Sequence, residues 1–584
     1  MRGTTPTKSG RMIALEALAK MPLLTGEELA AVCRKDRAWS SRALNGLRGE
    51  KLIEGTWYNL EGYGAMRWRL TELGVNTLAG WWKKPVRELL RRWPLSAEWE
   101  QSLLRRVQTV AVCHRIALDT SRLQETSLSW RWERSDVFDA FMGLEDGRTV
   151  GICRMGKALS AKAIASRMNS VQLLHDLRQV LGSLIVVPGL IEQERVVRRL
   201  AGAGANVAVG IESELSSGTR DMWRMTLRPS SGNVSTRDFI SSLLVSGFPE
   251  RHREPVRAAP PRSNGVRGVD AAELLMSRIS HNGANLFDLI SDWPLMQEQV
   301  AQEMLNVGDR RFAEMKREVV GSGIVASLKF PALRRGNGIL TPASRRMALT
   351  NDGLRQVAWR DRVTLSELLK SWKIFEDPNG HAGPRVNGYR LEGRKLRMLA
   401  RELKHTDSVH GIIQALHSEC AASASHEVVE VLPPHRWERW FYYNRRRYGI
   451  MPDATALVKC NGIRHAWLIE FEQRASTPKL MAEKMQRYVR YFGSLDTGQD
   501  FEVAPVALVV YPDRGSAARF AVTARRSVDR SRFGRNPRLR ILVSSVEDIQ
   551  RDRFMGPCWL DPWNMDAGTV TPASRRGTYE RIGE

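Results

Sequence analysis

The sequence predicts a multidomain α/β protein in which one arrangement, a small helical unit followed by an α/β unit, occurs twice. With 584 residues, the chain is longer than the length at which a single hydrophobic core keeps growing. Its composition, 42% hydrophobic and 26% charged residues, is typical of globular proteins. Segments of the two halves also align with each other, which indicates an internal duplication.

The first helical unit is predicted over residues 11–98, where two helices precede a hairpin that ends in Leu70–Gly74. The second is predicted over residues 269–375 and has the same order, with a hairpin that ends in Leu349–Gly353. A helix, a turn, a second helix and a two-stranded hairpin are the elements of a winged-helix domain. We therefore expect two winged-helix domains.

An α/β unit follows each helical unit, over residues 99–248 and 399–562. Ser135–Lys162 aligns without gaps on Pro452–Lys479 at a constant offset of 317. Both segments contain an acidic residue, an apolar strand, a turn, a second apolar strand and a basic helix. A further apolar run in each unit suits a buried strand.

Two segments lack a hydrophobic period. Residues 249–268 contain four prolines among several Arg and Gly residues, which is typical of a linker between the two halves. Residues 563–584 are polar, and we expect a flexible tail there.

The charge of the chain favours a polyanionic partner. Lys and Arg number 89 against 64 Asp and Glu, which gives a net charge of +25. Each neutralised phosphate of DNA releases condensed counterions, so such a surplus favours nucleic acid. We find no apolar run of 18 residues and no signal-peptide pattern. The expected partner is therefore DNA and not a membrane. We expect the protein in the bacterial cytoplasm, associated with the nucleoid or a plasmid. Proteins of a replication or transfer complex are further possible partners.

The second helix of each winged-helix unit carries basic residues. In a helix-turn-helix this helix enters the major groove, so we expect DNA contacts from its Arg and Lys side chains. Winged helices also serve as protein-contact modules, which is the alternative. The candidates are Arg42, Arg48, Arg310, Arg311 and Lys316.

An acidic pattern marks the second α/β unit. Asp453 precedes one apolar strand, and Glu470 and Glu472 lie two residues apart on the next, so both glutamates point to one face. Converging carboxylates bind Mg²⁺ or Mn²⁺ for phosphodiester cleavage, and we assign Asp453 and Glu470 as metal ligands. The catalytic lysine would be Lys479 or Lys484 on the following helix.

A structural role for these glutamates is the alternative. Glu470 and Glu472 would then form ion pairs with Arg474, Arg487 or Arg490 and orient the helix, as strand-end carboxylates often do.

The first α/β unit lacks this pattern. Its Asp136 aligns with the aspartate of the second unit, but Cys153 and Met155 replace the two glutamates, so we expect no Mg²⁺ there. Gly151–Ala158 resembles a phosphate-binding loop, but Ala158 stands where that loop needs Ser or Thr. We expect no nucleotide cofactor.

Basic and aromatic residues alternate just before Asp453, at Trp440, Arg445, Arg446 and Arg447. Rings that stack on bases and guanidinium groups that bind phosphates are the usual means of holding single-stranded or distorted DNA. We expect this segment to contact DNA.

The order of these motifs resembles the replication-relaxation family of plasmids and integrative elements. It comprises a winged helix ending in L-T-x-x-G, the pair His405–Thr406, a P-D pair and a strand ending in E-x-acid-x-Arg. The resemblance implies a winged helix joined to a restriction-endonuclease-like domain of the PD-(D/E)XK type, here in two tandem copies. It also implies Asp453, Glu470, Glu472 and Arg474 as site residues.

The sequence therefore predicts a DNA-binding protein of a plasmid or integrative mobile element, acting in replication, mobilisation or DNA processing. A Mg²⁺-dependent DNA endonuclease with an active second copy is one alternative. A winged-helix transcriptional regulator is another.

Overall fold

The computed structural model describes most of the chain. The described residues are 9–60, 62–122, 129–133, 137–143, 149–177, 180–201, 204–227, 232–245, 275–331, 333–335, 338–341, 343–376, 385–386, 389–473, 477–494, 501, 503–529, 540–564 and 568–572. The predicted linker at 249–268 lies outside these ranges, as do Asp136, Arg474 and most of the predicted tail.

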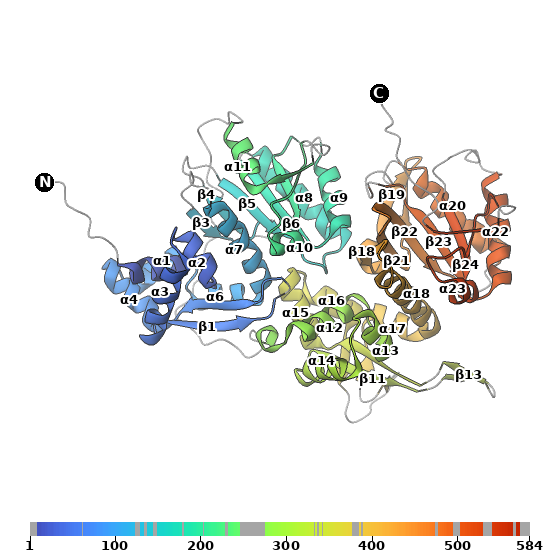
Figure 1. Cartoon of the computed structure of the whole chain (residues 1–584), viewed down its shortest axis with the longest axis horizontal. Helices are drawn as coiled ribbons and strands as arrows, with labels where there is room; N and C mark the ends of the chain where they lie inside the picture. Colours follow the sequence, from blue (N-terminus) through green and yellow to red (C-terminus); the bar gives the residue numbers. More distant parts are fainter. Residues whose placement is uncertain are drawn as a thin grey trace.

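The first helical unit packs five helices and a hairpin around one core (Figure 1). A capping box at Thr25 and a side-chain cap from Asp36 fix where its second and third helices begin. The elements are α1 (Gly10–Lys20), α2 (Gly26–Val32), α3 (Arg37–Gly49), β1 (Ile53–Tyr58), β2 (Ala65–Leu70), α4 (Glu72–Trp82) and α5 (Val86–Arg92).

The second helical unit has the same order of helices and main strands, with an added two-stranded ribbon, β12–β13, that projects from the body (Figure 1). Its elements are η1 (Leu275–Arg278), α12 (His281–Asp292), β10 (Met296–Gln297), α13 (Glu298–Met304), α14 (Asp309–Gly321), β11 (Val325–Phe330), β12 (Leu333–Arg335), β13 (Gly338–Thr341), β14 (Ser344–Leu349), α15 (Asn351–Asp361) and α16 (Leu365–Trp372).

The two helical units share an unusual internal bond. Leu23 and Leu295 both adopt positive φ, at 69° and 63°. A fully buried arginine donates to the carbonyl of each: Arg67 to Leu23 O at 3.0 Å and Arg346 to Leu295 O at 3.3 Å. Strained leucines held by buried guanidinium groups are uncommon, so their recurrence indicates one backbone plan.

The first α/β unit is built on a seven-stranded sheet. Helices α7 and α11 pack on one face, and α8 and α9 pack on the other. The elements are α6 (Ala97–Arg105), α7 (Val107–Ser121), β3 (Ser129–Trp132), β4 (Ala140–Gly143), β5 (Thr149–Arg154), α8 (Ala161–Asp176), β6 (Gly182–Val187), α9 (Leu190–Leu200), β7 (Val207–Ile211), α10 (Glu212–Ser217), β8 (Asp221–Met225), β9 (Asn233–Ser235) and α11 (Thr236–Val245).

The second α/β unit is built on another seven-stranded sheet, with α18 on one face and α20 and α22 on the other. A small three-stranded sheet, β15 (Ile374–Glu376), β16 (Arg385–Val386) and β17 (Tyr389–Leu391), precedes it. The remaining elements are α17 (Arg394–Arg401), α18 (Leu403–Ala421), β18 (His426–Leu432), α19 (Pro434–Trp437), β19 (Arg439–Tyr443), β20 (Arg446–Ile450), β21 (Ala454–Cys460), β22 (Ile463–Phe471), α20 (Pro478–Phe492), β23 (Val506–Tyr511), α22 (Arg514–Asp529), β24 (Ile541–Ser545), α23 (Val546–Asp552), β25 (Trp559–Leu560) and β26 (Thr569–Val570).

The two large sheets have the same topology. Their strand orders are β3-β4-β5-β6-β7-β8-β9 and β18-β21-β22-β23-β24-β25-β26, and in both the pairings run antiparallel twice, parallel twice and antiparallel twice. The mixed α/β class is therefore confirmed. In the described part of the chain, no helix combines the length and the apolar character that crossing a bilayer requires.

The two halves contact each other through charged groups. Arg436 in α19 pairs with Glu192 of α9 at 2.9 Å, and Arg362 at the end of α15 pairs with Asp139 of the first α/β unit. The backbone nitrogen of Ile191 donates to Glu430 of β18 at 3.0 Å. The first α/β unit thus lies against both units of the second half (Figure 1).

Candidate functional site

One aspartate occupies the same place in each large sheet. Asp453 accepts a hydrogen bond from the backbone nitrogen of Phe471, at 2.8 Å, where β22 ends. Asp139 accepts one from the backbone nitrogen of Arg154, also at 2.8 Å, where β5 ends. The counterpart of Asp453 is therefore Asp139, and the predicted match with Asp136 is wrong.

The correction follows from the length of the hairpin. Ala140 pairs with Ile152, twelve residues further on, whereas Ala454 pairs with Ile469, fifteen residues further on. The β21–β22 hairpin is three residues longer than the β4–β5 hairpin, so the offset of 317 holds for β5 and β22 and does not hold for β4 and β21. An alignment without gaps cannot show this difference, because the three additional residues lie in the turn between the strands.

In the second α/β unit, the two glutamates at the end of β22 both contact one lysine of α20. Lys484 Nζ lies 2.9 Å from Glu470 Oε2 and also pairs with Glu472. Tyr488, one turn further along α20, donates its hydroxyl to Glu470 Oε1. Lys479 lies exposed in the first turn of α20. The lysine that contacts the carboxylates is thus Lys484.

Burial and neighbouring charges set the protonation of this cluster. Burial raises the pKa of Glu470, and Asp453 raises it further, while Lys484 opposes both effects. Burial favours the neutral amine of Lys484, but Glu470 and Glu472 outweigh it and raise the pKa of Lys484. The lysine therefore stays charged and holds the two carboxylates together.

A histidine supports the aspartate of this cluster. His405 Nε2 lies 3.3 Å from Asp453 Oδ2 and 3.0 Å from the carbonyl oxygen of Phe471. Burial lowers the pKa of His405, but the bond to Asp453 outweighs this and raises it. The family resemblance includes His405 in its motif order. It does not include Tyr488, whose one signal is its position four residues after Lys484.

An open pocket of about 400 Å³ lies above the cluster. Trp440 from the β19–β20 hairpin borders it, and the acidic residues at its wall outnumber the basic ones. These are Glu438, Glu470, Glu472 and Glu483 against Lys484 and Arg487. An acidic pocket in a basic protein attracts a cation and repels a bare phosphate.

The carboxylates have the right chemistry for a divalent ion. Asp453 and Glu470 lie opposite each other on neighbouring strands, as the pairing of Ala454 with Ile469 requires, and both offer the oxygen ligands that Mg²⁺ prefers. Within the described ranges, no three His, Cys, Asp or Glu side chains are grouped as a metal site. Any ion would therefore rest on Asp453 and Glu470, with Lys484 beside it.

The same edge of the first α/β unit is closed. Cys153 and Met155 are fully buried at the positions of the two glutamates. Asp139 is fully buried and pairs with Arg362, at the end of α15, and with Arg106 at 3.6 Å. The second helical unit thus covers the position where the second α/β unit has its pocket.

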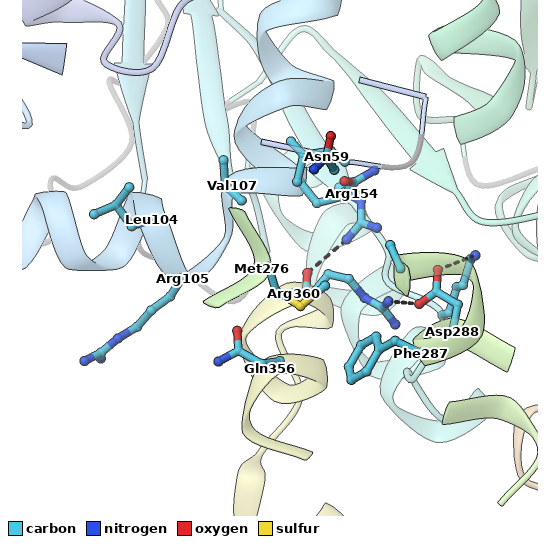
Figure 2. A pocket seen from close by; sticks show the side chains of 14 residues that line it. Asn59, Leu104, Arg105, Val107, Arg154, Met276, Phe287, Asp288, Gln356 and Arg360 are labelled. Carbon is cyan, nitrogen blue, oxygen red and sulfur yellow. Dashed lines mark hydrogen bonds and ion pairs between the residues drawn. The ribbon is translucent and has the colours of Figure 1, made fainter. Parts of the chain in front are cut away.

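Figure 2 shows this junction from close by, around a cavity of about 50 Å³. Arg154 donates to the carbonyl oxygen of Arg360 at 2.9 Å, and Arg360 pairs with Asp288. Lys157, in the segment that resembles a phosphate-binding loop, lies 3.5 Å from Asp288. The charged groups here are bound to one another.

Asp361 anchors the end of α15 in the same junction. It accepts a hydrogen bond from the backbone nitrogen of Ala158 at 3.1 Å. Burial raises the pKa of Asp361, but Arg360 more than offsets this and lowers it to about 2. A Cβ on Gly156 would lie 2.3 Å from Asp361 Cβ, so only glycine permits this approach.

The predicted DNA-contacting residues lie at three places. Arg42 and Arg48 are exposed on α3, and Arg310 and Arg311 are exposed on α14. Lys316 is only 27% exposed and pairs with Glu298 at 2.8 Å, so it links α14 to α13. The third place is the β19–β20 hairpin, where Trp440, Arg445, Arg446 and Arg447 are all exposed.

Comparison with models of protein families, with curated proteins and with solved structures finds no match for this chain.

Proposed function

We propose that the chain is a DNA-binding protein of a plasmid or integrative element that acts in replication, mobilisation or DNA processing. The observation that carries this proposal is the exposure of basic residues on the second helix of both helical units, α3 and α14, in a chain of net charge +25. That helix enters the major groove in helix-turn-helix proteins.

The shared details of the two halves support two winged-helix domains and two nuclease-like α/β domains that arose by duplication. Each helical unit has a helix, a turn, a basic helix and a hairpin, and each large sheet has the same strand order. The motif order that resembles the replication-relaxation family supports the setting in a mobile element.

Duplex binding by full-length protein tests the proposal. We expect Arg42→Ala with Arg48→Ala, or Arg310→Ala with Arg311→Ala, to weaken binding of a labelled duplex and to reduce its salt dependence, because phosphate contacts are lost. Arg91→Ala changes an exposed arginine of α5, serves as the control and should bind like the wild type. Equal affinity in all variants would exclude α3 and α14 as the DNA-contacting helices.

A Mg²⁺-dependent endonuclease is the second candidate, and the contact of Lys484 with Glu470 and Glu472 favours it. When bound, the ion would supply a nucleophilic water and neutralise charge on the phosphate. Lys484 would keep the two glutamates in place, and His405 would orient Asp453.

Incubation with supercoiled plasmid and Mg²⁺ or Mn²⁺ tests this second candidate. We expect nicking by the wild type and its loss in Asp453→Asn and Lys484→Met. Glu483→Gln changes another acid of the same pocket and serves as the control. Nicking that persists in Asp453→Asn would show that a contaminant or another site is responsible.

A further inference from the structure

The β19–β20 hairpin distinguishes the second α/β unit from the first. Residues 433–453 join β18 to β21, whereas only residues 133–139 join the corresponding strands β3 and β4. Asn444 and Arg445 form its two-residue turn and both have positive φ, at 49° and 64°. Such turns match the twist of a hairpin and give it a fixed shape.

The two faces of this hairpin have different roles. Phe441 and Ile450 are buried, and the ring of Phe441 lies 5.4 Å from that of Tyr491 in α20. On the outer face, Trp440 is 51% exposed and Tyr442 is 66% exposed. The inner face therefore anchors the hairpin, while the outer face presents aromatic rings to solvent.

The outer indole ring of Trp440 is held in position before any ligand arrives. Trp440 pairs across the hairpin with Gly449, where a Cβ would lie 3.2 Å from the indole ring. The guanidinium of Arg447 lies over the same ring, 4.6 Å from its centre. The space left by Gly449 and the guanidinium of Arg447 hold the indole in one orientation, so little conformational entropy is lost when a base stacks on its remaining exposed surface.

The charge on the hairpin suits a phosphate backbone, and the pocket beside it does not. Arg445, Arg446 and Arg447 are exposed at and after the turn. The adjoining pocket, bordered by Trp440, is acidic and would repel a bare phosphate. A bound strand would thus place its phosphates along the arginines and its bases toward the rings.

The outward rings favour an unpaired strand over a duplex. In a duplex the faces of the bases are covered by their neighbours, so a protein ring has no face on which to stack. A two-stranded ribbon can also enter the major groove, where it reads base edges through hydrogen-bonding side chains. The outward side chains of β19 are instead the aromatic rings of Trp440 and Tyr442, which suit stacking on exposed bases.

We propose that the β19–β20 hairpin binds single-stranded DNA, with bases stacked on Trp440 and Tyr442 and phosphates held by Arg445, Arg446 and Arg447. The pocket that contains Glu470 and Lys484 lies beside this site, because Trp440 borders it. This inference rests on the proposed function only in that the chain acts on DNA.

Fluorescence anisotropy of full-length protein with a labelled oligothymidylate, at several salt concentrations, tests it. Loss of one stacking ring costs about 5- to 150-fold in affinity, so we expect Trp440→Ala and Tyr442→Ala each to weaken single-strand binding within that range. Trp57→Ala removes a tryptophan that is 52% exposed on β1, and is the matched control. Arg445→Ala with Arg446→Ala should reduce the salt slope by about 0.7 per lost phosphate contact.

The same variants are measured on a blunt duplex, which separates this inference from the proposed function. Unchanged duplex affinity with weakened single-strand affinity supports the hairpin site. Equal loss on both substrates would overturn it in favour of a groove-reading ribbon, and equal affinity of Trp440→Ala and Trp57→Ala would overturn it outright. If the wild type binds single strands alone, the role of α3 and α14 fails and the hairpin site stands.

Discussion

The two aspartates in equivalent positions, Asp139 and Asp453, should lose very different amounts of stability in response to the same substitution. Asp139→Asn keeps the shape of the side chain and removes its charge. The carboxylate of Asp139 is fully buried and is shared by Arg362 and Arg106. We expect Asp139→Asn to destabilise the protein strongly, because both guanidinium groups lose this carboxylate.

The size of the effect follows from burial. Removing one partner of a buried ion pair costs about 3–5 kcal/mol. Arg106 is 7% exposed and Arg362 is 13% exposed, so water replaces little of the lost interaction. Asp453 is 21% exposed and contacts His405 and a backbone nitrogen, and an asparagine oxygen can still accept one of these bonds. For Asp453→Asn we expect a cost of about 1 kcal/mol.

Urea unfolding of full-length protein, followed by tryptophan fluorescence and circular dichroism, measures both variants. For Asp139→Asn, the free energy of unfolding at the first transition should fall by about 3 kcal/mol, so this transition occurs at lower urea concentration. The first transition of Asp453→Asn should stay near that of the wild type. If Asp139→Asn lost as little stability as Asp453→Asn, the assignment of Asp139 as a structural link between the halves would be refuted.

Three further outcomes follow from other buried groups. Burial raises the pKa of Glu28, but Arg67 more than offsets this and lowers it from 4.5 to about 2. The ionised Glu28 therefore contributes about 3 kcal/mol to folding stability above pH 4.5, and this contribution is lost as the pH falls toward 2. The melting temperature of Glu28→Gln should consequently depend less on pH in that range than that of the wild type. Lys484→Met removes the cation that lowers the pKa of buried Glu470, so this pKa should rise further. Because ionising buried Glu470 then costs more, the variant should lose more stability relative to the wild type at pH 8 than at pH 5, and the opposite trend in melting temperature would contradict the assigned contact. In Gly353→Ala a Cβ would lie 2.1 Å from the carbonyl oxygen of Ile324, so the melting temperature should fall by several degrees, whereas no change would show that the start of α15 can move.

Local patterns in the sequence were sufficient for the order of elements. Thr71 and Thr350 cap helices α4 and α15 by accepting from the backbone nitrogens of Gly74 and Gly353, and all four residues belong to the segments that were matched in the sequence. Caps, strand alternation and turns act over a few residues, so a single sequence carries them. The mixed α/β class followed from the same signals.

The partners of charged side chains were decided by tertiary structure. The strand period places Glu470 and Glu472 on one face, but it leaves Lys479 and Lys484 as alternatives, because the direction of a helix side chain depends on how the helix packs on the sheet. An alignment without gaps matches Asp453 with Asp136 and not with Asp139, since the length of a turn between strands leaves no periodic signal.

The repeated order of helical and α/β units and the acidic residues of the second sheet can be recognised from the amino-acid sequence. The closure of the first α/β unit cannot, because Asp139 is paired with Arg362, which lies 223 residues further along the chain. Hydrophobic periodicity and capping act between residues that are close in sequence, whereas an ion pair between two domains depends on how their folded surfaces meet.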